Sequence, residues 1–185
     1  MTRRMVLPTA CIAILAIVGV AGAATISMAD WEADPVQSIG DLTFTLADYS
    51  IGSNIMVEFW DYGAPFGSGV TFSNFPANGS VEYTVAINQT VAPGWWIDSV
   101  DLSYYDEGPN QNGVMTKLIV EENVTLGRGQ SYDVPDGVSS LTIEDTFTNI
   151  VGSGSNQFHT VIPEPATLGL LALGTVGMIR RRRRA

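Results

Sequence analysis

Alternation of apolar and polar residues dominates the middle of the chain, from about residue 25 to residue 162. The clearest sets are Leu42, Phe44 and Leu46; Ile55, Val57 and Phe59; and Val81, Tyr83, Val85 and Ile87. Successive side chains of a β-strand point to opposite faces, so a period of two is typical of a strand with one buried face. The middle of the chain is therefore predicted to form strands, and no stretch of it predicts an amphipathic helix.

Further segments bring the expected number of strands to about nine. Two of these sets have an aspartate among apolar residues: Trp96, Val100, Leu102 and Tyr104 with Asp98, and Leu141, Ile143 and Phe147 with Asp145. The others are Val114, Thr116, Leu118 and Val120, and the short runs 69–75, 131–134 and 157–162. The segment 152–156, Gly-Ser-Gly-Ser-Asn, is expected to be a loop. Turn signals such as Pro93-Gly94 and Asn112-Gly113 separate the strands at intervals of about ten residues, which predicts an all-β fold, an antiparallel β-sandwich of jelly-roll type.

The first 23 residues have the layout of a secretory signal peptide. Arg3 and Arg4 precede an apolar core, and small residues follow it. Cleavage is expected after Ala23, at the Ala21-Gly22-Ala23 triplet, by signal peptidase, which leaves a domain of residues 24–160. A retained N-terminal helix is the alternative. Cys11 stands inside the apolar core rather than at its end, so we expect it to be removed with the signal rather than to carry a lipid.

The charge of the predicted mature domain limits its partners. Eighteen of the nineteen acidic residues lie between residues 24 and 162, against two basic residues, Lys117 and Arg128. Such a surface repels phosphate backbones, which excludes nucleic acid as a partner. No cysteine follows Cys11, so stability must come from a hydrophobic core rather than from disulfides.

The segment 161–185 combines three features. Pro163-Glu164-Pro165 holds the chain extended, because each proline fixes its own φ and restricts the residue before it. Residues 166–179 carry no charge, and a helix of this length would span about 21 Å. That is short of a hydrocarbon core of about 30 Å, unless the bilayer thins or the arginines snorkel to the head groups. Arg180, Arg181, Arg182, Arg183 and Arg184 then act as a stop-transfer signal that stays in the cytoplasm.

Together these three features resemble the PEP-CTERM sorting tail of exported bacterial proteins, a tail that also carries the name ice-binding protein C-terminal domain. The resemblance covers about residues 162–185, with Pro163, Glu164 and Pro165 as its motif. It implies recognition and removal of the tail by an exosortase-type membrane protease, after an intermediate held in the inner membrane, and delivery to the cell surface or the extracellular matrix. A permanent anchor that is never processed is the alternative, although such an anchor would not need the Pro-Glu-Pro motif.

Aromatic and acidic residues are the candidates for binding or catalysis in the domain. Trp95 and Trp96 stand at the start of an expected strand and point in opposite directions, so one of them is a candidate contact for a glycan or a protein partner. The neighbours Glu121 and Glu122, and likewise Glu144 and Asp145, must face opposite ways. A glycosidase pair would therefore have to form across strands, and no catalytic residue is assigned.

The sequence gives little indication of a metal site. His159 is the only histidine, and zinc sites usually draw on several His or Cys ligands. Asp98, Asp101 and Asp106 are weak candidates for calcium, but their spacing does not match a helix-loop-helix site, and a solvated acidic rim explains them as well. No cofactor is expected.

The sequence thus predicts an exported, non-enzymatic protein of the cell surface or extracellular matrix, which the sorting resemblance associates with extracellular polysaccharide. A structural or adhesive role is expected. The alternative is a carbohydrate-binding module or a glycan-active enzyme that carries the same tail.

Overall fold

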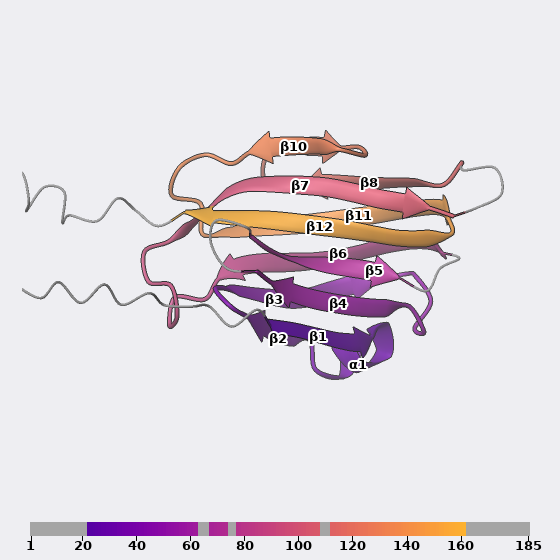
Figure 1. Cartoon of the computed structure of the whole chain (residues 1–185), viewed down its shortest axis with the longest axis horizontal. Helices are drawn as coiled ribbons and strands as arrows, with labels where there is room; N and C mark the ends of the chain where they lie inside the picture. Colours follow the sequence, from indigo (N-terminus) through magenta and orange to yellow (C-terminus); the bar gives the residue numbers. More distant parts are fainter. Residues whose placement is uncertain (1–21, 63–66, 74–76, 108–111, 162–185) are drawn as a thin grey trace, which may run out of the picture.

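The computed structural model describes residues 22–62, 67–73, 77–107 and 112–161. These residues form two antiparallel sheets of six strands each, which lie one behind the other in Figure 1. The prediction of an all-β sandwich is confirmed. Among the described residues no helix has the length and apolar character needed to cross a membrane. The apolar core of the expected signal and the expected membrane stretch 166–179 lie outside the described residues.

Each sheet is built from strands far apart in the sequence. The first sheet contains, in neighbour order, β1 (Gly22–Ser27), β4 (Met56–Asp61), β5 (Ser68–Ser73), β12 (Gly152–Val161), β7 (Trp96–Asp106) and β10 (Gln130–Asp133). The second sheet contains β2 (Val36–Ile39), β3 (Leu42–Tyr49), β6 (Ala77–Ile87), β11 (Ser140–Ile150), β8 (Val114–Ile119) and β9 (Val124–Leu126).

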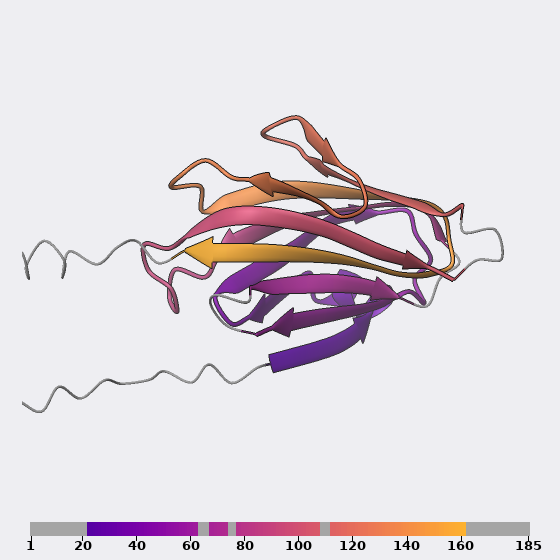
Figure 2. The ribbon, with the colours of Figure 1, turned by 45° about the horizontal axis from the view of Figure 1, so that its top comes forward.

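From β5 onwards the chain moves repeatedly from one sheet to the other. Of the connections between β5 and β12, only the one from β8 to β9 stays within a sheet. As a result β12 lies between β5 and β7 in the first sheet, while β11 lies between β6 and β8 in the second. Figure 2 shows β12 and β7 side by side along most of their length.

The core is a single apolar layer between the sheets, rich in aromatic rings. Phe44 of the second sheet contacts Phe59 and Phe158 of the first, with ring centroids 5.3 and 5.8 Å apart. Alternation produced this layer, because the sets predicted for β3, β4, β6 and β11 do point inward and are buried, apart from the half-buried Leu46. The two sheets therefore share one core, and polar residues within it need a specific explanation.

A short helix and three edge strands were not predicted. Helix α1 (Met28–Ala33) starts at a capping box in which Ser27 and Asp30 bond each other's backbone amides. Trp31 on α1 is fully buried, and its ring meets that of Phe59 edge to face at 4.9 Å. The helix thereby covers the core beside β1 with only six residues, too few to show a helical period. Within the described residues, strands β1, β2 and β9 each pair with one neighbour and have six, four and three residues.

The predicted face of β7 is wrong at its start. Ile97, rather than Trp96, is buried together with Val100 and Leu102. The register explains the change: His159 of β12 pairs with Ser99, but the next residue of β12 pairs with Ile97. One residue of β7, Asp98, is thus extra, and such a bulge reverses the alternation of side chains.

The predicted face of β8 is wrong throughout. Met115, Lys117 and Ile119 are completely buried, whereas Val114 and Val120 are each 45% exposed. Both faces of this strand carry apolar residues. Because Lys117 is on the inward face, the sequence pattern made the outward face appear to be the more apolar of the two. Burial of Lys117 is possible because its amine donates a hydrogen bond to the Asp101 carbonyl of the opposite sheet and lies over the Phe158 ring.

The predicted loop 152–156 is also wrong, since β12 begins at Gly152. Small residues suit this strand because its neighbours approach closely. A Cβ atom on Gly154 would lie 2.2 Å from the sulfur of Met115, so the inward face at this position has no room for a side chain. Two residues further on, Asn156 points into the core and is completely buried.

Candidate functional site

Four polar side chains meet inside the sandwich, where the sequence predicts only core. They are Tyr83 of β6, Lys117 of β8, Asp145 of β11 and Asn156 of β12, each 0% exposed, and we call them the polar cluster. Three come from neighbouring strands of the second sheet, and Asn156 comes from the first. The cluster therefore links the two sheets through polar contacts.

Asp145 is the centre of the polar cluster. Its Oδ2 atom accepts hydrogen bonds from the Tyr83 hydroxyl at 3.1 Å and from Nδ2 of Asn156 at 2.5 Å. Nδ2 of Asn156 also donates to the Tyr83 hydroxyl oxygen at 3.0 Å. Strand register places Asp145 directly opposite Lys117. The Asp145 carboxyl group therefore contacts the carboxamide of Asn156 from the first sheet. Lys117, which carries the amine, is its direct partner on the neighbouring strand β8 of the second sheet.

Lys117 crosses the interior from the second sheet to the first. Its Nζ donates to the backbone carbonyl oxygen of Asp101 at 3.0 Å and lies 4.7 Å from the centre of the Phe158 ring. The carbonyl and the aromatic face together stabilise a group that would otherwise be costly to bury.

Burial changes the acid–base behaviour of both groups. Loss of hydration lowers the pKa of Lys117 to about 7, although the charges of Asp145 and Asp101 act in the opposite direction. Loss of hydration raises the pKa of Asp145 to about 6, which Lys117 and the hydrogen bonds from Tyr83 and Asn156 only partly offset. Both groups thus change protonation state near neutral pH, in contrast to an exposed lysine or aspartate.

Two oxygen atoms of the polar cluster have no hydrogen-bond partner. Oδ1 of Asp145 and Oδ1 of Asn156 are buried and accept no bond in the part of the chain that the structure describes. Unpaired buried oxygens are uncommon because they lose hydration without compensation. The cluster therefore holds two unpaired acceptors and, in Lys117, an amine whose hydrogen bond goes to the Asp101 carbonyl instead.

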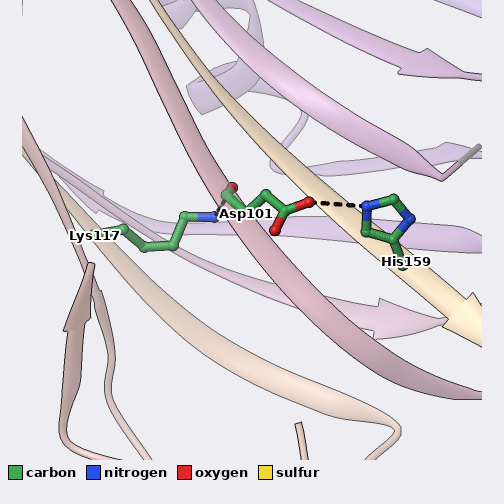
Figure 3. A network of polar contacts seen from close by, with 3 residues as sticks. All are labelled: Asp101, Lys117 and His159. Atoms are coloured by element: carbon green, nitrogen blue, oxygen red, sulfur yellow. Dashed lines mark hydrogen bonds and ion pairs between the residues drawn. The ribbon is translucent and has the colours of Figure 1, made fainter. Parts of the chain in front are cut away.

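Asp101 connects the polar cluster to the surface, as Figure 3 shows. Its backbone carbonyl faces the core and binds Lys117, while its carboxylate lies on the outer side of β7. There Oδ2 of Asp101 lies 2.9 Å from Nε2 of His159 on β12, and both side chains are about one third exposed. The His159 side chain is therefore held against Asp101 across the β7–β12 pair.

The calcium candidates do not come together. Asp98 is exposed, Asp101 pairs with His159, and the buried Asp106 accepts from the backbone amides of Gly113 and Val151. Asp98 and Asp106 are eight residues apart along one strand, a distance of about 26 Å. Within the described residues no group of three or more His, Cys, Asp or Glu side chains could hold a metal ion.

Trp95 and Trp96 are both half-buried. Trp95 packs against the edge of the core, and Trp96, whose Nε1 is buried without an acceptor in the described structure, starts β7. Tyr62 is more exposed than either, at 62%, and its ring centre lies 5.1 Å from that of Trp60.

Of the carboxylate pairs considered for catalysis, only Glu144 and Asp145 lie in a strand, whereas Glu121 and Glu122 lie in the turn between β8 and β9, so strand alternation does not apply to them. Asp145 points into the core and Glu144 points outward, while Glu121 accepts the backbone amide hydrogen of Thr142 with both oxygens at 2.9 Å. Glu144 and Asp145 therefore do not face a common space.

Residues 163–165 and 180–184, with the proposed functions in sorting and stop-transfer, lie outside the described residues. The comparison with protein families covers them: a family described as PEP-CTERM protein-sorting motif matches residues 161–184. The chain carries a PEP-CTERM sorting motif. No curated protein and no solved structure matches the chain. The PEP-CTERM motif marks the protein for export, for processing by an exosortase, and for placement at the cell surface or outside the cell.

Sequence reasoning missed the polar cluster, although two signals pointed to it. Asp145 interrupts a set of apolar residues that all face inward, and Lys117 is the only lysine of the chain. A charge that keeps strand phase with buried neighbours is a candidate for burial. Asn156 gave no such signal, because the small residues around it are typical of a loop.

Proposed function

We propose that this protein is a structural or adhesive component of the cell surface or extracellular matrix. The observation that carries the proposal is the position of the sorting motif, which begins at residue 161, where β12 ends. Removal of the tail beyond this point leaves every strand of the sandwich intact. A compact domain that survives loss of its tail is what a sorting route with proteolytic release requires.

The proposal includes both processing steps. Signal peptidase cuts after Ala23, and an exosortase-type protease cuts near Pro163 while residues 166–179 hold the intermediate in the membrane. Strand β1 starts at Gly22, so the first cut leaves residues 24–27 of this edge strand paired with β4. Ala23 and Ala24 are exposed, and the loss of Gly22 and Ala23 removes no core side chain.

We also assign the sandwich to the jelly-roll type. Support comes from strands β5 to β12, which are distributed over the two sheets in the order β5-β12-β7-β10 and β6-β11-β8-β9. This interleaving of two four-stranded sheets is the winding of a jelly roll, which β4 and β1 extend at one edge of the first sheet and β3 and β2 at the same edge of the second.

The test is the intact mass of the protein from its native host, compared with the mass from a host that lacks an exosortase. We expect a chain that begins at Ala24 in both hosts and ends near Pro163 only in the native host. A chain that retains Arg180 to Ala185 in the native host would overturn the sorting step and leave a domain anchored in the membrane.

The alternative function is carbohydrate binding, and the pair of rings of Trp60 and Tyr62 favours it. Both residues are near the end of β4, and Tyr62 offers an exposed ring face on which a sugar can stack. Binding of soluble matrix polysaccharide that is lost in Tyr62→Ala but kept in Trp95→Ala would support this alternative. No binding by the wild-type protein would exclude the tested glycan as its ligand.

A further inference from the structure

The polar cluster brings together three groups that can react with one another. It contains a primary amine on Lys117, a carboxamide on Asn156 and a carboxyl group on Asp145, all closed off from solvent. We propose that Nζ of Lys117 forms an isopeptide bond with Cγ of Asn156, with release of ammonia, and that Asp145 transfers the protons. The polar cluster is then the site of a self-modification that occurs once in each molecule.

Strand register holds the reacting groups close together. Asp145 lies directly opposite Lys117 and contacts Nδ2 of Asn156. Nζ of Lys117 binds the carbonyl oxygen of Asp101, whose neighbour Leu102 pairs with Asn156. Nζ of Lys117, from β8, and the side chain of Asn156, from β12, therefore contact neighbouring residues of β7 and of its ladder with β12.

The aromatic contact of Lys117 gives a second measure of this proximity. The Phe158 ring beneath Nζ is the next inward residue after Asn156 on β12, about 7 Å along the strand. The reaction requires a change of rotamer at Lys117 that moves Nζ from the Asp101 carbonyl to the Asn156 side chain. Groups confined to one buried site in this way react far faster than the same groups free in solution.

The protonation states suit an attack by the amine. An ammonium group is not a nucleophile, but the pKa of Lys117 near 7 leaves a large fraction as free amine at neutral pH. With its pKa near 6, Asp145 can both accept and return a proton in the same range. The pKa values thus support a reaction that the geometry already suggests.

The reaction balances without any further reagent. Nζ attacks Cγ of Asn156, and the excess proton on nitrogen passes to Asp145. Asp145 then protonates Nδ2, the Cγ–Nδ2 bond breaks, and ammonia leaves. The products are a secondary amide and ammonia, and Asp145 returns to its starting state.

The reaction gives each of the two unpaired oxygens of the polar cluster a hydrogen-bonding role. Oδ1 of Asn156 is the carbonyl oxygen on which negative charge develops during the attack, and a protonated Asp145 can stabilise it. After the reaction Oδ1 of Asp145 can accept a hydrogen bond from the N–H of the new amide. Loss of the lysine charge also removes the cost of burying it.

The first measurement is the intact mass of the denatured full-length protein. We expect a mass lower by one ammonia molecule than the mass calculated from the sequence of the same chain. The variant Asp145→Asn, which keeps the shape of the side chain, should show no such loss. Asn123→Gly serves as the matched control, because it removes an exposed carboxamide at a positive φ that glycine tolerates, and the loss should persist.

The second measurement locates the bond with trypsin. Outside the two chain ends, the only cleavage sites are Lys117 and Arg128. In the cross-linked protein Lys117 is blocked, and the two fragments produced at Arg128 stay joined on a denaturing gel. The variant Lys117→Met should also be cut only at Arg128, but its two fragments should separate.

Each outcome decides the question. Loss of ammonia together with joined fragments supports the bond between Lys117 and Asn156. Joined fragments with loss of water instead would show that Asp145 is the acyl group and overturn this assignment. Full mass, or loss of ammonia with fragments that separate at both sites, would overturn the proposal, and the cluster would then be a purely non-covalent contact. None of these results depends on processing of the tail.

Discussion

Lys117 and Asp145 pair on neighbouring strands, and both side chains are completely buried. Burial of each charged group costs several kcal/mol. Partners from both sheets limit this cost, since Lys117 has the Asp101 carbonyl and the Phe158 ring while Asp145 has Tyr83 and Asn156. The isopeptide bond would remove the part of this cost that belongs to Lys117, because an amide carries no charge. Variants that cannot form the bond should therefore reveal the titration of both groups.

The variant Asn156→Leu should show a minimum of stability near pH 6 to 7. The pKa of Asp145 is raised from 3.8 to about 6, so the folded state binds a proton more tightly and stability falls as pH rises through this window. The pKa of Lys117 is lowered from 10.5 to about 7, so the unfolded state holds the proton more tightly and stability rises between pH 7 and 10.5. Urea unfolding across pH 4 to 11 measures both effects, each on the order of a few kcal/mol. Loss of the alkaline rise in the double variant with Lys117→Met is the control, and a flat profile would contradict the assignment.

At the scale of the elements, close contact between β4, β5 and β12 depends on Gly69. A Cβ atom at this position would lie 2.2 Å from the carbonyl oxygen of Asn156 and 2.5 Å from the Trp60 ring. We expect Gly69→Ala to lower the free energy of unfolding by about 1–3 kcal/mol, as crowding in a packed site does. Thermal unfolding measures the change.

Gly127→Ala is the matched control for Gly69→Ala. The nearest atom to its new Cβ, Oε1 of Gln130, is 3.4 Å away, which is an ordinary contact. Its melting temperature should stay close to that of the wild type. Equal melting temperatures for the two variants would show that the strands move apart at little cost.

The strands that could be predicted are those in which only one face is apolar. Tyr83 and its neighbours on β6, like Leu141 and its neighbours on β11, alternate cleanly and are buried as expected. Prediction failed where a local event overrode the period: the extra residue Asp98 reversed β7, and the buried lysine hid the inward face of β8. The short edge strands β1, β2 and β9 and the six-residue helix α1 have too few residues to show a periodic pattern of apolar side chains.

The two kinds of functional residue differ in how far a sequence can reveal them. The sorting motif is a linear signal, so adjacent residues suffice to find it. The polar cluster is assembled from four strands, and its members are up to 73 residues apart, as Asn156 and Tyr83 are. Only pairing and register bring them together, and neither is written in a local pattern.

For the whole molecule, the excess of acidic side chains should make stability depend on salt. Eighteen acidic residues and two basic ones share the region from 24 to 162, so repulsion between like charges opposes folding. We expect the melting temperature to rise as NaCl increases from about 0.01 to about 0.1 M, because the screening length falls from about 30 to about 10 Å. Calcium chloride at equal ionic strength tests the calcium candidates: a similar rise indicates screening, and a larger, saturable rise would indicate a specific site.

Strand β12 determines how the sandwich responds when its tail end is pulled. It pairs with β5 over six residues and with β7 over ten, so a load that enters at Val161 acts along two ladders of hydrogen bonds at once. Shear of this kind breaks many bonds together. Within the described structure, strand β1 at the edge of the same sheet has a single neighbour, β4, and can peel away one bond at a time. The molecule is thus mechanically asymmetric: it resists force more strongly when pulled at β12, where the tail joins it, than when pulled at β1.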